Sequence, residues 1–253
     1  MRKLFFVVLF LLMAGPATGF AQAAKPQTMA DRIPGFIPGY LSKEEIPNSV
    51  ALLPLPPEAG SVAFALDQDI AKHAVESETK DAARFQQAYV DSILVFPDAV
   101  KSFESTLGIE ISETKTPRLY VLMRRVLTDA ALSVGGAKNK YQRARPFMIN
   151  NTPTCTPKEE EGLRKNGSYP SGHTAIGWAW ALVFAEIFPA KADAIFQRGY
   201  AYGESRVACN VHWHSDVEAG RILGAATVAR LHANPTFLED LAAAKKEVIA
   251  PGN

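Results

Sequence analysis

The chain has 253 residues, 47% of them hydrophobic, with 27 Lys and Arg against 26 Asp and Glu. This ordinary apolar content excludes an intrinsically disordered chain and makes a single domain the default. The net charge of +1 gives no reason to expect nucleic acid or an anionic membrane surface as a partner.

The first residues have the pattern of a secretory signal peptide. Two basic residues at positions 2 and 3 precede the apolar segment 4–14, and a small-x-small pattern ends at Ala23. The apolar segment is shorter than the roughly 20 residues that a membrane span needs, so an uncleaved anchor is the weaker alternative. We therefore predict that residues 1–23 are cut off after Ala23 and that the mature chain is exported to the periplasm.

Residues 24–60 are rich in proline and glycine and include the run Leu-Pro-Leu-Pro-Pro at 53–57. Successive prolines and the residues before them disfavour helix and favour extended backbone. We predict an extended arm that lies across the body of the protein, which would itself comprise residues 61–253.

From residue 61 onward, apolar side chains recur every three or four positions, which is the period of an amphipathic helix. The segments with this pattern are 61–94, 116–133, 174–185, 191–205, 215–232 and 236–248. No alternating run is long enough for a sheet. Segment 174–185 is nearly all apolar but too short to cross a membrane, so it is expected to be a central core helix. The prediction is a single all-α, bundle-like domain.

Three short segments carry unusually dense polar chemistry, at 138–147, 170–173 and 203–216. Lys138 and Arg145 are seven residues apart, so on a helix they would project from the same side. His212 and Asp216 are four apart, a spacing at which a carboxylate can hold an imidazole on a helix. A plain solvated basic face is the alternative for the first segment taken alone.

The segment Pro-Ser-Gly-His at 170–173 has the composition of a helix start. Ser171 is a good N-cap, and the free N–H groups behind it, beginning at Gly172, can bind an anion. His173 would lie in that first turn, close to the anion. An ordinary capped helix with an adjacent histidine is the alternative on these residues alone.

Together, the three segments fit a phosphate dianion. Arginine forks such as those of Arg145 and Arg206 match phosphoryl oxygens bidentately, and Lys138 adds a point charge. Of two nearby histidines, one can attack phosphorus while the other protonates the leaving oxygen.

A zinc site is the rival interpretation, because His212, His214 and Asp216 form a plausible ligand set. Three cationic side chains in the same constellation would repel a metal ion, which argues against it.

The only two cysteines, Cys155 and Cys209, would both lie in the exported part of the chain, where a single disulfide between them is expected. Two free buried thiols are the alternative.

The linked patterns Lys-x6-Arg-Pro, Pro-Ser-Gly-His and Ser-Arg-x5-His-x3-Asp resemble the signature of the type-2 phosphatidic acid phosphatase and vanadium haloperoxidase superfamily. The matching positions are Lys138, Arg145, Pro146, Pro170, Ser171, Gly172, His173, Ser205, Arg206, His212 and Asp216. Gly-Ser-Tyr-Pro-Ser-Gly-His-Thr, Gly-Glu-Ser-Arg-Val and the proline-rich arm further resemble the class A bacterial non-specific acid phosphatases. This resemblance covers essentially the whole mature chain.

The resemblance implies a role for each matched position. His212 would be the nucleophile that forms a phosphohistidine, and Asp216 would fix its orientation. His173 would be the general acid and then the base that activates water. The phosphoryl oxygens would be bound by Lys138, Arg145, Ser171, the Gly172 N–H and Arg206, and no metal or other cofactor is expected.

The function implied is hydrolysis of phosphomonoesters such as nucleotides, sugar phosphates and aryl phosphates, with transfer of phosphate to alcohols left open. Relatives commonly self-associate, so a homo-oligomer is expected, and the mature form would need neither nucleic acid nor a membrane. Three other functions are weighed against this one: a vanadate-dependent haloperoxidase, a lipid phosphatase and a non-catalytic phosphate-binding protein. A bell-shaped pH profile on the acid side is expected because one histidine must be neutral and the other protonated.

Overall fold

The computed structural model describes residues 36–78 and 81–249 of the chain. The expected signal peptide, its cleavage site and the first part of the arm lie outside these residues. Within the described residues the chain forms helices and turns with no β-strand. The helices are α1 (Ser49–Leu52), α2 (Val62–Glu78), α3 (Ala82–Val90), α4 (Asp98–Leu107), α5 (Pro117–Ser133), α6 (Gly135–Tyr141), α7 (Pro146–Asn150), η2 (Pro157–Glu159), α8 (Glu160–Arg164), α9 (Gly172–Ile187), η3 (Pro189–Lys191), α10 (Ala192–Ala208), α11 (His214–Leu231) and α12 (Pro235–Ile249).

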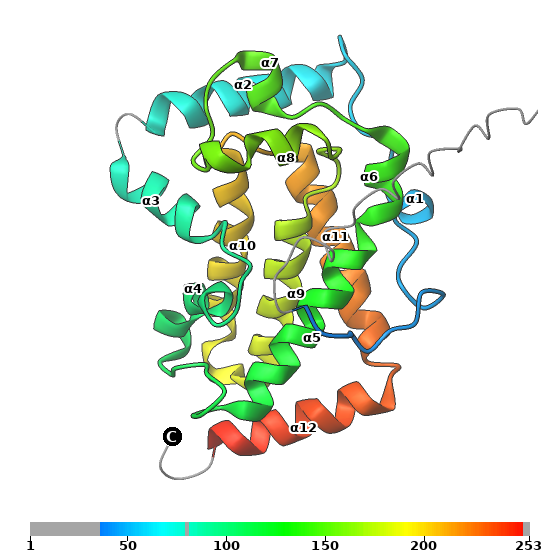
Figure 1. Cartoon of the computed structure of the whole chain (residues 1–253), viewed down its shortest axis with the longest axis vertical. Coiled ribbons are helices and arrows are strands. Elements are labelled where there is room, and N and C mark those ends of the chain that lie inside the picture. The colour runs from blue at the N-terminus through cyan, green and yellow to red at the C-terminus, as the bar shows by residue number, and fades with distance from the viewer. Residues whose placement is uncertain (1–35, 79–80, 250–253) are drawn as a thin grey trace, which may run out of the picture.

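Helix α9 lies at the centre, with α5, α10 and α11 packed around it and α12 crossing their lower ends (Figure 1). Its side chains are apolar on nearly every side, and most of them are buried, including Trp180 and Phe184 at 0% exposure. A helix that is apolar all round must be covered by other helices. This confirms the predicted central core helix, and the predicted helices at 116–133, 191–205, 215–232 and 236–248 correspond to α5, α10, α11 and α12.

Two glycines let neighbouring helices approach α9 closely. A Cβ at Gly220 of α11 would lie 2.6 Å from the carbonyl oxygen of Ser171, and one at Gly177 of α9 would lie 2.2 Å from the ring of Tyr202. Both distances are well inside van der Waals contact. The contact at Gly220 brings the start of α9 against the first part of α11, where the second and third motif segments meet.

The described part of the arm lies across the helical body, as Figure 1 shows. The N–H of Tyr40 donates to the buried carboxylate of Asp129 in α5 (2.8 Å), and its hydroxyl donates to Asp240 in α12 (2.8 Å). Farther along, the carbonyl of Pro54 accepts from the hydroxyl of Tyr169 (2.8 Å). The arm is not extended throughout, because Asn48 caps the short helix α1 through its side-chain oxygen.

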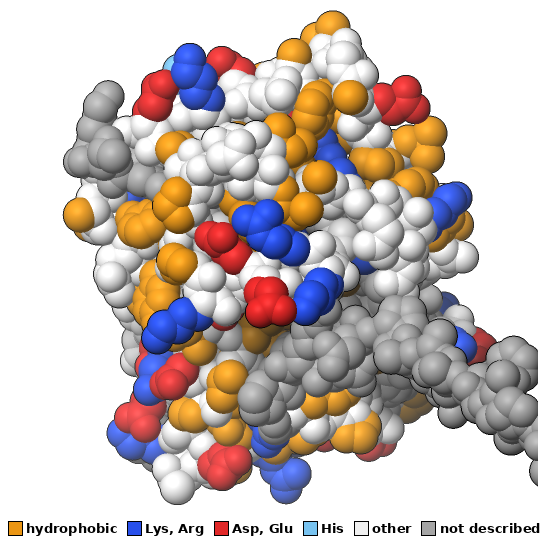
Figure 2. Space-filling model, turned by 45° about the horizontal axis from the view of Figure 1, so that its top comes forward, with side chains coloured by type: hydrophobic (Ala, Val, Ile, Leu, Met, Phe, Trp, Pro, Cys, Tyr) orange, Lys and Arg blue, Asp and Glu red, His pale blue; other side chains and the backbone are white. Residues whose placement is uncertain are grey.

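The molecular surface carries charges of both signs. On the face in Figure 2, Lys and Arg side chains are interspersed with Asp and Glu, and hydrophobic side chains lie scattered between them. This matches the nearly balanced composition. Among the helices of the described segments, none combines the length and the apolar character needed to cross a membrane.

Candidate active site

The three motif segments converge at one end of the bundle. Lys138 comes from α6, Arg145 precedes α7, Ser171 precedes α9 and Arg206 lies in the last turn of α10. His212 lies in the turn that joins α10 to α11. The N–H groups of Val211 and His212 both donate to the carbonyl of Arg206 (3.2 Å each), so this turn folds back over the end of α10.

The hydrogen bonds of His212 define which of its ring nitrogens carries a proton. Its Nε2 lies 3.1 Å from Nη1 of Arg145, and because a guanidinium can only donate, Nε2 must be the accepting, unprotonated nitrogen. Its Nδ1 lies 3.3 Å from Oδ2 of Asp216, which can only accept when ionised. Neutral His212 is therefore held with a lone pair on Nε2, the form that a nucleophile needs.

Asp216 lies behind His212 and is completely buried. Its Oδ2 accepts from the hydroxyl of Ser168 and from the N–H of Trp213 (2.9 Å), while its Oδ1 accepts from Arg143 (2.6 Å). A carboxylate that accepts this many hydrogen bonds is fixed in position. The turn at His212 is not helical, yet the four-residue spacing still brings the predicted pair together, because Asp216 caps the start of α11.

The support behind Asp216 extends to α2. Arg143 donates to Asp67 (2.7 Å) and to the hydroxyl of Ser215 (2.8 Å), and the N–H of Ser215 donates to Asp67 (2.9 Å). We call Arg143, Asp67, Ser215, Ser168 and Asp216 the rear cluster. Sequence reasoning assigned no role to the first four, although the first lies in the basic run and the fourth directly precedes the Tyr-Pro-Ser-Gly-His motif.

Lys138 and Arg145 reach the site, but not by sharing a helical face as predicted. Helix α6 ends at Tyr141, Gln142 takes a left-handed φ of 44°, and Arg145 has extended backbone. The two cations meet instead at the segment before α9: Nζ of Lys138 donates to the carbonyls of Gly167 (2.6 Å) and Ser168 (3.2 Å). Arg145 donates to Gly167 as well (3.5 Å) and to Val211 (2.9 Å).

Arg206 differs from the other cations of the site. It is 1% exposed, and its Nε and Nη1 have no hydrogen-bond partner among the described residues. It lies in the last turn of α10. A buried guanidinium with unpaired donors is costly unless an acceptor with negative charge is supplied.

The start of α9 adds further donors. Ser171 is the N-cap, and its Oγ accepts from the N–H of Thr174 (3.3 Å) and from the hydroxyl of Thr174 (2.8 Å). Both bonds use Ser171 as acceptor, so its own hydroxyl proton can be donated elsewhere. The N–H of Gly172 begins the helix, where the backbone offers it no intrahelical acceptor. We call Lys138, Arg145, Arg206, Ser171 and Gly172 the cradle.

His173 lies in the first turn of α9 and is partly exposed. Its Nε2 lies 2.9 Å from the carbonyl of Ser92, in the segment between α3 and α4. The two histidines therefore have different partners: His212 is held by a carboxylate and an arginine, and His173 by a backbone carbonyl.

Burial and the nearby cations together lower the pKa of both histidines. Burial, followed by the charges of Arg145, Lys138 and Arg206, holds the pKa of His212 well below 6.5. Burial, followed by Arg206, lowers the pKa of His173 as well, while the Ser92 carbonyl raises it.

Cys155 and Cys209 form a disulfide, which confirms the predicted bridge; their Cα atoms are 4.8 Å apart. Cys209 directly follows α10, three residues after Arg206, and Cys155 lies in the segment between α7 and η2. The bridge therefore ties the end of α10 to the segment that follows α7.

The zinc interpretation of His212, His214 and Asp216 does not fit the geometry. Nε2 of His214 is directed at Glu218 (3.9 Å), and the ligand atoms of these two gather with Glu204 instead. Both glutamates already bind the guanidinium of Arg221. His214 thus belongs to a partly exposed ion-pair group beside the site.

Comparisons with known proteins identify the family to which the chain belongs. A model of the PAP2 superfamily matches residues 119–238. The non-specific acid phosphatase of Providencia stuartii is 44% identical over 82% of this chain and 84% of its own length. That of Salmonella typhimurium is 39% identical over 83% of each chain, and the acid phosphatase of Zymomonas mobilis is 39% identical over 76% of this chain and 72% of its own. The chain therefore belongs to the PAP2 superfamily and, within it, to the bacterial non-specific acid phosphatases.

Proposed function

We propose that this acid phosphatase hydrolyses phosphomonoesters to alcohol and inorganic phosphate through a phosphohistidine at His212, without a metal ion. The observation that carries the proposal is the buried Arg206, whose Nε and Nη1 lack acceptors. A phosphate dianion in the cradle would supply them, and the hydroxyl of Ser171 and the N–H of Gly172 could donate to the same group. The three cations that favour a dianion would repel a metal ion.

In the first half of the reaction, Nε2 of His212 attacks phosphorus with the lone pair that now accepts from Arg145. The bond from phosphorus to the leaving oxygen breaks, and protonated His173 gives its proton to that oxygen. Asp216 stabilises the positive charge that develops on the imidazole of His212, because its carboxylate faces Nδ1 at 3.3 Å.

In the second half, neutral His173 takes a proton from water as the water oxygen attacks the phosphohistidine. The phosphorus–nitrogen bond breaks, His212 returns to its neutral form, and inorganic phosphate leaves. If an alcohol took the place of water, the same step would transfer the phosphoryl group to it. We propose that both acceptors are used.

The partly exposed His173 marks the side of the site at which the leaving group would lie, and no other part of the substrate needs to be held by the cradle. This supports broad use of small phosphomonoesters, including nucleotides, sugar phosphates and aryl phosphates. We further propose that the chain is divided into a signal peptide (1–23), an arm (24–60) and a catalytic domain (61–253), is exported to the periplasm, and self-associates.

The test is hydrolysis of p-nitrophenyl phosphate by the mature protein at about pH 6, near the second pKa of phosphate, in excess EDTA. The variant His212→Ala is measured beside it, and His214→Ala is the matched control because that histidine pairs with Glu218 outside the cradle. We expect turnover in EDTA by the wild type and by His214→Ala, and none by His212→Ala.

Activity abolished by EDTA would instead make the site metal-dependent. Full turnover by His212→Ala would exclude this histidine as the nucleophile. Binding of phosphate without any turnover would make the protein a phosphate-binding relative that lacks catalysis.

A further inference from the structure

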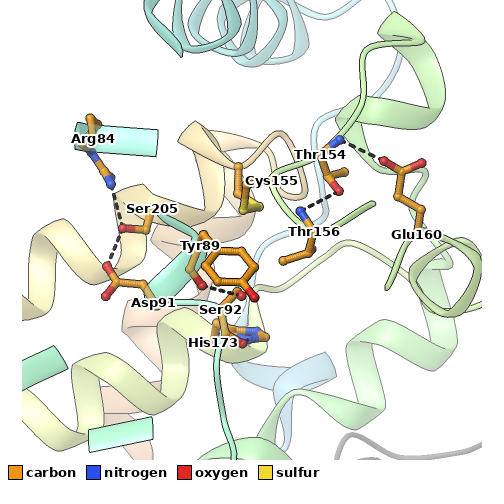
Figure 3. Close-up of a disulfide and its surroundings, with 11 residues drawn as sticks. Arg84, Tyr89, Asp91, Ser92, Thr154, Cys155, Thr156, Glu160, His173 and Ser205 are labelled. Carbon is orange, nitrogen blue, oxygen red and sulfur yellow. Dashed lines mark hydrogen bonds between the residues drawn. A yellow bond between two sulfur atoms is a disulfide. The ribbon is translucent and has the colours of Figure 1, made fainter. Parts of the chain in front are cut away.

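Ser205, the serine of the Ser-Arg motif, does not face the cradle although its neighbour Arg206 does. It is fully buried, and its hydroxyl donates to Oδ2 of Asp91 (2.5 Å) while it accepts from Nη1 of Arg84 (2.9 Å). Figure 3 shows this chain of contacts beside His173 and the disulfide. The proposed chemistry leaves this motif residue without a role.

Asp91 is the residue on which these contacts converge. It directly follows α3, is 0% exposed, and also accepts from Arg198 of α10 and from the amide of Gln87 (2.9 Å). A buried carboxylate bonded to two helices fixes them relative to one another. Asp91 therefore holds the end of α3, and with it the next residue, Ser92, against α10.

Ser92 is the residue that binds His173. Its carbonyl accepts from Nε2 of His173 (2.9 Å), and its own hydroxyl donates to the carbonyl of Tyr89 (2.7 Å), which fixes the turn further. Because a carbonyl can only accept, Nε2 of His173 must carry a proton. The nitrogen that exchanges a proton with substrate and water is then Nδ1.

We propose that Asp91 and Ser205 are positioning residues that hold the Ser92 carbonyl against Nε2 of His173, so that Nδ1 is the atom that protonates the leaving oxygen. The proposal rests on the proposed function of His173 as general acid. It links the serine of the third motif to the histidine of the second through a loop that neither motif contains.

The hydrogen bond between His173 and the Ser92 carbonyl also affects how easily His173 is protonated. Arg206 of α10, His212 in the turn before α11 and Arg145 before α7 all disfavour its protonated form, and burial does so most of all. The Ser92 carbonyl is the contact that opposes them. A displaced Ser92 would leave His173 harder to protonate as well as misdirected.

The test uses Asp91→Asn and Ser205→Ala in the mature protein, with kcat/KM measured for p-nitrophenyl phosphate and for glycerol phosphate. This constant reports the step in which the leaving group departs. A nitrophenolate needs little protonation, whereas an alkoxide needs a proton from the general acid. We expect kcat/KM for glycerol phosphate to fall about tenfold more than that for p-nitrophenyl phosphate, a part of the 10²–10⁴ that general acid catalysis typically contributes. The basic limb of the glycerol phosphate profile should also move to lower pH.

The matched control is Asp129→Asn, which makes the same change at another fully buried carboxylate, one that binds the arm through Tyr40 and Leu41. It should affect both esters equally. Equal losses for both esters in Asp91→Asn and Ser205→Ala, with an unmoved basic limb, would overturn the proposal. If Asp91→Asn does not fold, Ser205→Ala decides alone. Wild-type protein that turns over neither ester would refute the proposed function instead.

Discussion

Two arginines near His212, the partly buried Arg143 and the fully buried Arg206, differ in their hydrogen-bond partners. Arg143 in the rear cluster is bonded to the carboxylates of Asp67 and Asp216 and to Ser215. Arg206 in the cradle has two donors with no acceptor among the described residues. Arg143 is thus paired with carboxylates of the fold, whereas two donors of Arg206 are not satisfied by any described residue.

The difference shows how the same residue type can serve folding in one place and binding in another. A buried ion pair with satisfied hydrogen bonds fixes geometry, here the orientation of Asp216 and through it of His212. A buried cation without an acceptor disfavours the folded state until an anion binds, and this is the property of a preorganised anion site. Variants of Arg143 and Arg206 should therefore affect stability and turnover differently.

The largest effect is expected from Arg143→Met. It would leave Asp67 and Asp216 buried without their shared cation, and breaking a buried pair in this way typically costs about 3–5 kcal/mol. The free energy of unfolding, measured in urea, should fall by that order. An unchanged midpoint would mean that the rear cluster does not support the fold.

For Arg206→Met we expect a loss of turnover without a loss of stability. Losing one preorganised donor to the transition state typically lowers kcat by about 10²–10³, and a similar loss is expected here. The urea midpoint should stay the same or rise, because the variant removes a buried charge that has unpaired donors. If Arg206→Met unfolded at a lower urea concentration yet kept its turnover, Arg206 would instead stabilise the fold as Arg143 does.

Inorganic phosphate should stabilise the wild type more than Arg206→Met. Inorganic phosphate at 100 times its Kd should stabilise the wild type by about 2.7 kcal/mol, since it binds only the folded cradle. The same concentration should stabilise Arg206→Met far less. Equal stabilisation of both proteins would place the anion elsewhere.

The smallest expected effect is on the pH dependence of kcat/KM. His212 must be neutral to attack, and its lowered pKa keeps it neutral on the acid side of 6.5. His173 must be protonated to donate, and its lowered pKa means that kcat/KM falls as pH rises through an acidic value. The profile of kcat/KM should therefore peak below pH 6.5. A plateau that extends to pH 8 would contradict the assigned protonation states.

Local patterns predicted much of this fold, because helical periodicity and the capping serine act over a few residues. Ser171 caps α9 as expected, and Asp216 meets His212 at the predicted spacing. The shared helical face of Lys138 and Arg145 was wrong because the chain turns at Gln142, which nothing in the basic run signalled.

The rear cluster could not be predicted for a different reason. Asp67 and Ser215 are 148 residues apart, and their hydrogen bond depends on how α2 packs over the start of α11. Neither residue carries a local pattern that indicates a partner. Their pairing is a product of tertiary structure, whereas the cradle residues belong to recognisable short motifs.

The most direct test of the account is to trap the covalent intermediate. Mature protein would be mixed briefly with a phosphomonoester labelled at phosphorus, quenched, and examined for protein-bound label. We expect label that survives alkali, is released by acid, maps to the peptide containing His212, and is absent from His212→Ala. Label on another residue, or rapid turnover without any bound label in the wild type, would contradict the phosphohistidine route.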